Sequence, residues 1–192
     1  MSERPKLLWP AAAVLAVFCT ALPAIQFSNP EFPPALWHLT PLFAAGILFG
    51  AGLSLWKAIG LMLAVRLTAD LGIWAVTGES EYAFWGHAQW FNYLALAVIP
   101  LAGLLIGVKP KAAAILGAAL SGPIAFFLIS NFGVWAFQPS VEVRSLWHVY
   151  YDGLPFLRNS LLASPVWAAL FFSPPVRDAI FEGDTSPNRV VA

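Results

Sequence analysis

Runs of about twenty apolar residues recur six times along this chain, and such a run is long enough to cross the ~30 Å hydrocarbon core of a membrane. Of the 192 residues, 59% are hydrophobic and 10% are charged, whereas about 25% are charged in a soluble domain. A water-soluble chain of this size could not cover so large an apolar core with polar surface. The sequence therefore predicts an all-α, polytopic membrane protein with a bundle of six transmembrane helices. The predicted spans are residues 7–25, 39–56, 58–77, 90–108, 112–137 and 154–172.

The basic residues outside the spans predict how the bundle is oriented. Almost all of them lie before the first span, in the second and fourth gaps, or after the last span: Arg4, Lys6, Lys57, Lys109, Lys111, Arg177 and Arg189. The first, third and fifth gaps contain only Arg144. By the positive-inside rule, both termini and the even gaps are cytoplasmic. We expect one transmembrane domain over residues 1–173 in the cell's inner membrane, followed by a disordered cytoplasmic tail over residues 174–192.

Two charged residues lie within the third predicted span. Arg66 and Asp70 are four residues apart, so they share a helix face and can form an ion pair. Charges at such depth are costly, usually face the interior of a bundle, and often mark a functional site. A structural ion pair that fixes one helix against another is an equally good interpretation of the two residues alone.

Further polar residues lie in the outer halves of several other predicted spans. If the topology is correct, they form one layer with the third span, and ligand-sized pockets are often built from such convergent polar groups. The inner half of the bundle is almost entirely apolar except for Arg66. We therefore expect a binding pocket that opens outward. The predicted substrate-binding residues are Asp70, Asn131, Arg158, Asn159, Asn92 and His38.

Motifs for catalysis and for metal or phosphate binding are absent from the sequence. There is no His-Glu-x-x-His, no Gly-x-Ser-x-Gly, no phosphate-binding loop and no Cys-x-x-Cys. His38, His87 and His148 all fall on the predicted outer side but lack metal-ligand spacing, so we interpret them as loop or interfacial residues. We expect no catalytic residue, no metal, no cofactor and no nucleic-acid partner.

Small residues at four-residue spacing allow transmembrane helices to approach closely. They occur at Ala12 and Ala16, at Gly46 and Gly50, and at residues 103 and 107, which are also glycines. Packing inside the bundle is the simpler explanation. A docking surface for a second subunit is the alternative, and Ala12 and Ala16 are its candidates.

Two stretches near the end of the chain carry a family resemblance: Phe126-Phe-Leu-Ile-Ser-Asn-Phe-Gly-Val-Trp135 and Leu154-Pro-Phe-Leu-Arg-Asn-Ser-Leu-Leu162. Together with Asp70 and the stretch from His87 to Tyr93, they resemble a bacterial family of uncharacterised small membrane proteins. That family is similar to the substrate-binding S components of energy-coupling factor (ECF) vitamin transporters. The resemblance implies an S-component-like fold of six helices with a small nutrient bound in its outer half. It also implies a separate transmembrane scaffold and two ATPases as partners, with Ala12 and Ala16 resembling the motif that contacts the scaffold.

Three functions remain open from the sequence. The first is a membrane component that binds a vitamin- or cofactor-like small molecule for uptake, with membrane lipids around it. The second is a membrane enzyme that acts on a lipid or isoprenoid, using Asp70 or a histidine as an acid–base group. The third is a non-catalytic accessory subunit of a membrane complex, in which the polar residues only lock the bundle together. In the first hypothesis, Arg158 pairs with the ligand, or with Asp70 when the ligand is absent.

Overall fold

The structure is a computed structural model that describes residues 8–29, 31, 39–137 and 145–181. These residues form helices joined by short connections, with no strand among them, so the predicted all-α class is confirmed. The elements are α1 (Leu8–Ser28), α2 (Leu42–Gly52), α3 (Leu55–Thr77), α4 (Ser80–Ala83), η2 (Gly86–Ala88), α5 (Gln89–Ile106), α6 (Ala112–Phe137), α7 (Leu146–Phe171) and α8 (Pro174–Phe181).

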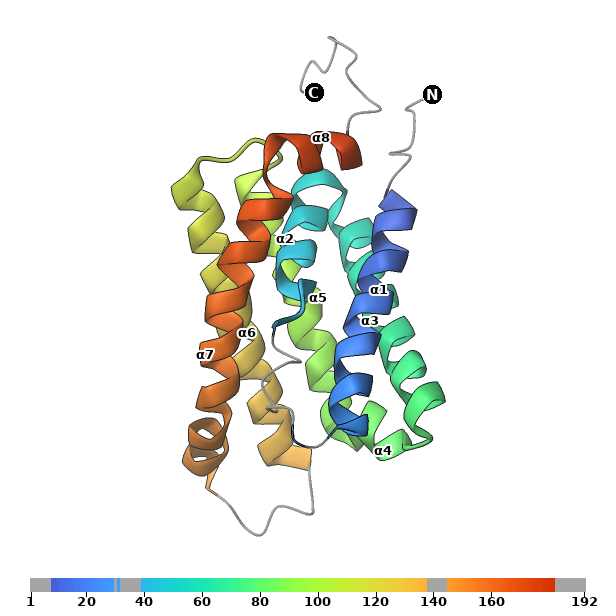
Figure 1. The fold of residues 1–192 in the computed structure, drawn as a ribbon. Coiled ribbons are helices and arrows are strands. Elements are labelled where there is room, and N and C mark those ends of the chain that lie inside the picture. Colours follow the sequence, from blue (N-terminus) through green and yellow to red (C-terminus); the bar gives the residue numbers. More distant parts are fainter. Residues whose placement is uncertain (1–7, 30, 32–38, 138–144, 182–192) are drawn as a thin grey trace.

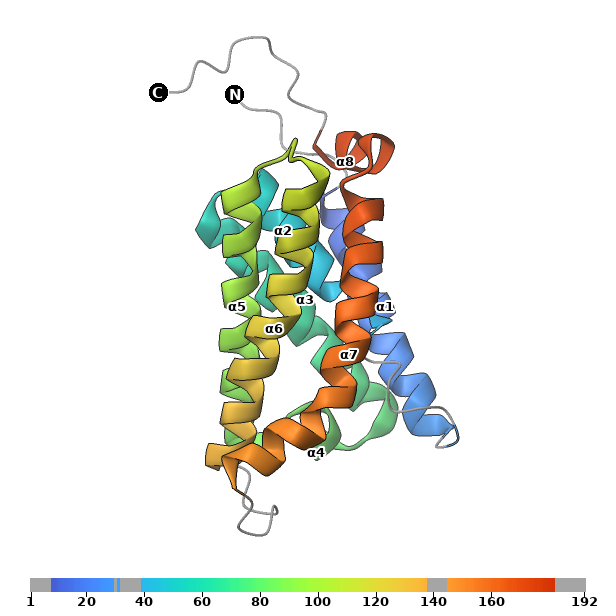
Figure 2. The ribbon, with the colours of Figure 1, turned by 90° about the vertical axis from the view of Figure 1, so that its left-hand side faces the viewer.

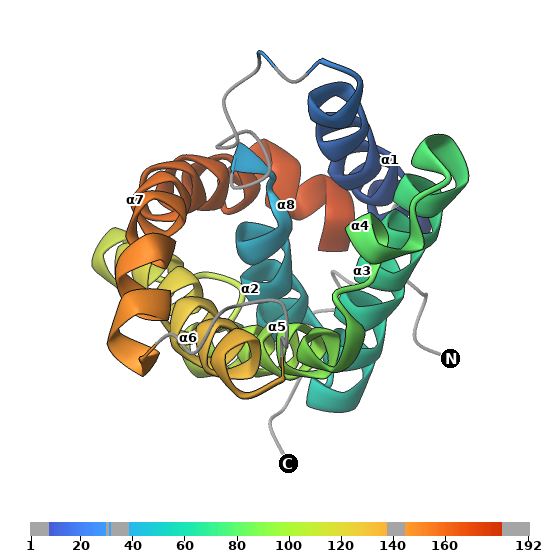
Figure 3. The ribbon, with the colours of Figure 1, turned by 90° about the horizontal axis from the view of Figure 1, so that it is seen from below.

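The long helices run up and down between the two ends of a bundle. The start of α1 and the short helix α8 lie at one end, and α4 lies at the other (Figure 1). In the view along the bundle, α2 lies in the middle with the other long helices around it (Figure 3). It packs against α3, α5, α6 and α7, and every residue from Leu42 to Gly50 is buried. A helix that is apolar on all sides belongs in such a position.

Among the residues that the structure describes, three helices are long and apolar enough to cross a membrane: Leu55–Thr77, Gly86–Ile106 and Ala112–Phe137. Their outward side chains fit a lipid environment, because many large apolar residues on them are exposed. Examples are Leu67, Leu104 and Leu128, which are 46%, 50% and 50% exposed. The chain is therefore a membrane protein.

The second predicted span, residues 39–56, is only partly helical. The helix α2 covers 11 residues, or about 16 Å at 1.5 Å per residue, and cannot cross a ~30 Å core by itself. The backbone is extended at Ser54 and Leu53 before α3 begins. Hydropathy alone could not reveal this, because the residues on both sides of the break are apolar. As a result, α2 fills the centre of the bundle only in the half that contains α8 (Figure 1).

Glycines allow α2 and α5 to cross at very short distance. A Cβ on Gly50 would lie 1.9 Å from the Pro100 carbonyl oxygen, and one on Gly103 would lie 1.8 Å from the Ile47 carbonyl oxygen. Any side chain at either position would overlap the other helix's backbone. The small residues Gly46 and Gly50 therefore serve helix packing inside the bundle. Gly107 has a different role, because it is the C-cap of α5 and has a φ of 68°.

The alanines expected to form a docking surface are instead buried. Ala12 and Ala16 are each 5% exposed and belong to the hydrophobic core. Their helix α1 packs against α3, where the contact is so close that a Cβ on Gly72 would lie 2.7 Å from Thr20 Cγ2. The expectation of a free docking face at Ala12 and Ala16 is wrong, because the small residues serve packing within the chain.

The last part of the chain contains more helix than the apolar pattern predicts. The helix α7 begins at Leu146, eight residues before the predicted span, because Ser145 caps it by accepting a hydrogen bond from the His148 amide. The first turns are bent away from the rest of α7 (Figure 2), and α7 contains Pro155 and Pro165, a residue type that often bends helices. Residues 174–181, expected to be disordered, form α8, which begins with Pro174 at a position where proline is favourable. The remainder of the predicted tail lies outside the described residues.

Candidate functional site

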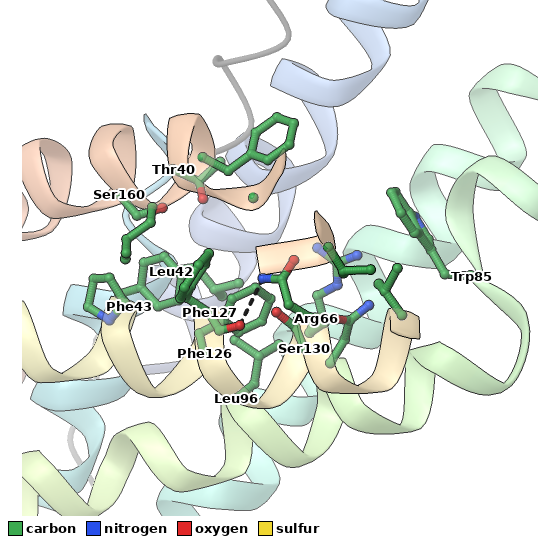
Figure 4. A pocket seen from close by; sticks show the side chains of 18 of the residues that line it. Thr40, Leu42, Phe43, Arg66, Trp85, Leu96, Phe126, Phe127, Ser130 and Ser160 are labelled. Atoms are coloured by element: carbon green, nitrogen blue, oxygen red, sulfur yellow. Dashed lines mark hydrogen bonds between the residues drawn. The ribbon is translucent and has the colours of Figure 1, made fainter. Parts of the chain in front are cut away.

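A cavity of about 480 Å³ lies below the start of α2, in the half of the bundle away from α8. Its volume is in the range typical of small-molecule sites. The cavity exists because α2 begins only midway along the bundle, so that Thr40, Leu42 and Phe43 end it on one side (Figure 4). Beyond them, the closely packed core around α2 fills the interior. Its polar lining residues are Gln26, Thr40, Arg66, Asn92, Ser130, Asn131, Asp152 and Ser160.

The deeper walls of the cavity are aromatic. Phe43 from α2 and Phe126 from α6 meet edge to face, with ring centroids 5.3 Å apart, and Phe127 makes a similar contact with Tyr150, at 5.4 Å. In the close-up, Arg66 and Ser130 lie between this aromatic group and Trp85 (Figure 4). The cavity therefore offers apolar aromatic walls at one end and hydrogen-bonding groups in its middle.

Asp70 lies at the centre of a polar network next to the cavity. Its side chain is 0% exposed, and Oδ1 lies 2.5 Å from Arg66 Nη2. Its other oxygen, Oδ2, accepts hydrogen bonds from Gln89 Nε2 at 2.8 Å and from the Tyr93 hydroxyl at 2.9 Å. The Gln89 amide oxygen in turn accepts a bond from Asn92 Nδ2 at 2.9 Å. The network joins α3 to the first turns of α5 and holds the Arg66 guanidinium beside the cavity.

The register of α7 decides which of its polar residues reach the cavity. Gly153, Phe156, Leu157 and Ser160 line it, as expected for positions spaced three and four residues apart on one helix face. Gly153 also lets α7 approach α6, since a Cβ there would lie 2.7 Å from Asn131 Oδ1. Arg158 faces the other way and is exposed in a shallow apolar groove on the outside of α7.

The structure brings together some of the predicted site residues and separates others. Asn92 and Asn131 line the cavity, and Asp70 lies behind Arg66, which lines it. Arg158 and Asn159 are not among the lining residues, and Asp70 pairs with Arg66 instead of Arg158. The alternative pairing of Asp70 with Arg158 is therefore wrong, and His38 lies outside the described residues.

Several residues that shape the site were not among those predicted. Gln89 and Tyr93 satisfy the buried carboxylate, and Arg66 reaches the cavity from mid-span. The sequence contains one usable signal for them: Gln89 and Tyr93 are four residues apart, on the same face of α5. No sequence signal exists for the aromatic walls, because phenylalanines are spread through the whole chain.

The other two histidines have local partners. His87 stacks on Phe137 with ring centroids 6.4 Å apart, and His148 Nδ1 lies 2.7 Å from the Ser145 hydroxyl. Within the described ranges, no three His, Cys, Asp or Glu side chains come together in a way that could hold a metal ion.

Residues 3–175 match the model of a family of unknown function, DUF6580, and the chain belongs to this family. No curated protein matches the chain. No solved structure matches it either.

Proposed function

We propose that this protein is the substrate-binding membrane component of an uptake system for a small, vitamin- or cofactor-like molecule. The observation that carries the proposal is the cavity of about 480 Å³ with aromatic walls and a central cluster of hydrogen-bonding groups. A cavity of this kind is the usual form of a small-molecule site. The resemblance to ECF S components supports the same function, with a six-helix bundle in a bacterial inner membrane.

The shape of the interior favours capture of a ligand over conduction through a pore. A channel needs a polar path along its whole length. Here the cavity ends at Leu42 and Phe43, and the core behind them consists of buried apolar residues such as Ile47, Leu48 and Met62. With both termini in the cytoplasm, as the basic residues predict, the cavity opens to the outer side. Any scaffold and ATPases that energise uptake would dock elsewhere than at the buried Ala12 and Ala16.

The test is native mass spectrometry of the protein purified from its own membranes, with a variant that fills the cavity. Val134 lines the cavity, whereas Leu128 on the same helix is 50% exposed on the outside. We expect a small molecule to accompany the wild-type protein and the Leu128→Trp control, and to be lost from Val134→Trp. The lost species should be identified, and radiolabelled uptake of that compound should require the intact protein.

Two results would contradict this function. The first is a bound molecule that survives Val134→Trp as well as Leu128→Trp, because it would then lie outside the cavity. The second is a membrane lipid or isoprenoid in the cavity that is converted to a product on incubation, which would favour the enzyme hypothesis. The melting temperature of both variants shows whether either has lost its fold.

A further inference from the structure

We propose that the ligand of this cavity is a small organic anion, in which a flat apolar body carries a carboxylate that binds at Arg66 and Ser130. The inference rests on the proposed function and specifies the ligand's chemistry. Its basis is the pair of hydrogen-bond donors that line the middle of the cavity, the Arg66 guanidinium and the Ser130 hydroxyl.

Arg66 has more donors than its partner can accept. A guanidinium carries five N–H groups, while one oxygen of Asp70 is already occupied by Gln89 and Tyr93. Arg66 Nη2 lies 2.5 Å from the remaining oxygen, Oδ1, and neither that oxygen nor the buried Arg66 Nε forms a hydrogen bond within the described residues. The Arg66 side chain is 19% exposed and lines the cavity. Because part of the Arg66 side chain is open to the cavity, an acceptor there can meet guanidinium donors that Asp70 does not use.

Ser130 is a second unsatisfied group beside Arg66. It is 8% exposed, lines the cavity and forms no hydrogen bond with any residue that the structure describes. A serine hydroxyl in a dry site usually bonds to a neighbouring carbonyl or to a ligand. In the close-up view, Ser130 and Arg66 lie in the same central part of the cavity (Figure 4).

The start of α2 favours negative charge in the same space. The first amides of a helix have no partner within the helix and carry a partial positive charge. Here the N-cap residue is Pro41, which supplies no side-chain hydrogen bond, and the next residues, Leu42 and Phe43, are both buried and line the cavity. This uncapped end adds a positive potential at the aromatic end of the cavity, while the carboxylate itself binds at Arg66.

The charges around the cavity are compatible with an anion. Asp70 forms an ion pair with Arg66, and its Oδ2 accepts two hydrogen bonds, while Oδ1 is buried without a hydrogen bond. Asp152, the other carboxylate nearby, is exposed and already has an interaction partner. The aromatic walls formed by Phe43, Phe126 and Phe127 supply the surface for the flat apolar part of the ligand.

A matched set of probes tests the charge of the ligand. The purified protein, in lipid nanodiscs, is titrated by calorimetry with 2-naphthoate, 2-naphthamide and 2-naphthylmethylammonium, with empty nanodiscs as the reference. These probes share one ring system and differ in charge. We expect 2-naphthoate to bind about tenfold more tightly than the neutral amide, because hydrogen bonds to a charged acceptor are about twice as strong. The ammonium probe should bind most weakly.

Two serines provide the matched variants. Ser130→Ala should weaken 2-naphthoate binding about fivefold through loss of one hydrogen bond to a carboxylate. Ser164 is also a buried serine without a hydrogen-bond partner, but it does not line the cavity, so Ser164→Ala should leave binding unchanged. Arg66→Lys keeps the charge but loses the planar fork, and it should reduce the preference for naphthoate over naphthamide.

Two outcomes would overturn the inference. If the amide or the ammonium probe binds as tightly as naphthoate and is equally sensitive to Ser130→Ala, the cavity is a binding site but its ligand is not an anion. The proposed function then survives. If none of the probes binds above the level of empty nanodiscs, the inference fails, and the proposed function depends on the mass spectrometry described above.

Discussion

Gly103→Ala is expected to prevent the bundle from assembling, at a cost of at least ~3 kcal/mol, because overpacking of a well-packed contact is destabilising. The added methyl group would lie 1.8 Å from the Ile47 carbonyl oxygen and 2.7 Å from the Ala51 amide nitrogen. Neither backbone atom can move without displacing α2, which is buried in the centre. The measurement is the yield of monodisperse protein in detergent, together with its thermal melting.

Gly117→Ala and Gly60→Ala are the controls for this prediction. Both glycines lie in long helices, and a Cβ at either one has nothing within 4 Å. These substitutions should be neutral or stabilise the helix by up to ~1 kcal/mol, because alanine has the higher helix propensity. If Gly103→Ala behaved like the controls, the close crossing of α2 and α5 would be incorrect, and so would the position of the end of the cavity.

Asp70→Leu is the second substitution with a large expected effect. It leaves the Arg66 guanidinium without its counter-charge and removes the acceptor for Gln89 and Tyr93. Removal of one member of a buried ion pair typically costs ~3–5 kcal/mol, because the other charge remains without a partner in low dielectric. The double variant Arg66→Met with Asp70→Leu should be milder than the sum of the two single changes, since no charge is left behind.

The measurement is the free energy of unfolding of the two single variants and the double variant, in mixed micelles with increasing SDS. Comparison of the three values gives the coupling energy between Arg66 and Asp70. Arg158→Gln serves as the control, because Arg158 is exposed on the outside of α7 and has no salt bridge among the described residues. Strict additivity of the Arg66 and Asp70 changes would mean that their side chains do not interact.

The parts of the fold that follow from local hydropathy were predictable. The run over residues 112–137 coincides with α6, and those over residues 58–77 and 90–108 lie close to α3 and α5. These three runs are followed in the sequence by Gly78, Lys109 and Gln138. The early end of α2 was not predictable in this way, because the break before α3 consists only of Leu53 and Ser54 between apolar neighbours. The cavity lies at the other end of α2, where the helix begins only at Leu42.

The site was only partly predictable, because helix rotation decides which side chains face inward. Asn131 and Arg158 both lie on helices that line the cavity, yet only Asn131 faces it. The difference reflects the rotation of α7, which places Gly153 and Ser160, but not Arg158, on the face that lines the cavity. Asp70 could be identified as unusual from its depth, but its partners Gln89 and Tyr93 come from another helix, and the sequence does not give the rotation of α5 against α3.

The central claim is that a ligand-sized cavity is reached from the outer side of the membrane, and thiol labelling from each side tests it most directly. The background is Cys19→Ala, which leaves no other cysteine in the sequence. Single cysteines then replace Ser130 in the cavity, Ser164 in the packed core, or Trp56. Trp56 is 81% exposed and lies at the start of α3, whereas α4 follows the other end of that helix. A small, membrane-impermeant methanethiosulfonate should modify Ser130→Cys only on intact cells, Trp56→Cys only in inside-out vesicles, and Ser164→Cys in neither. Labelling of Ser130→Cys only in inside-out vesicles would contradict the claim, because the cavity would then open to the cytoplasm.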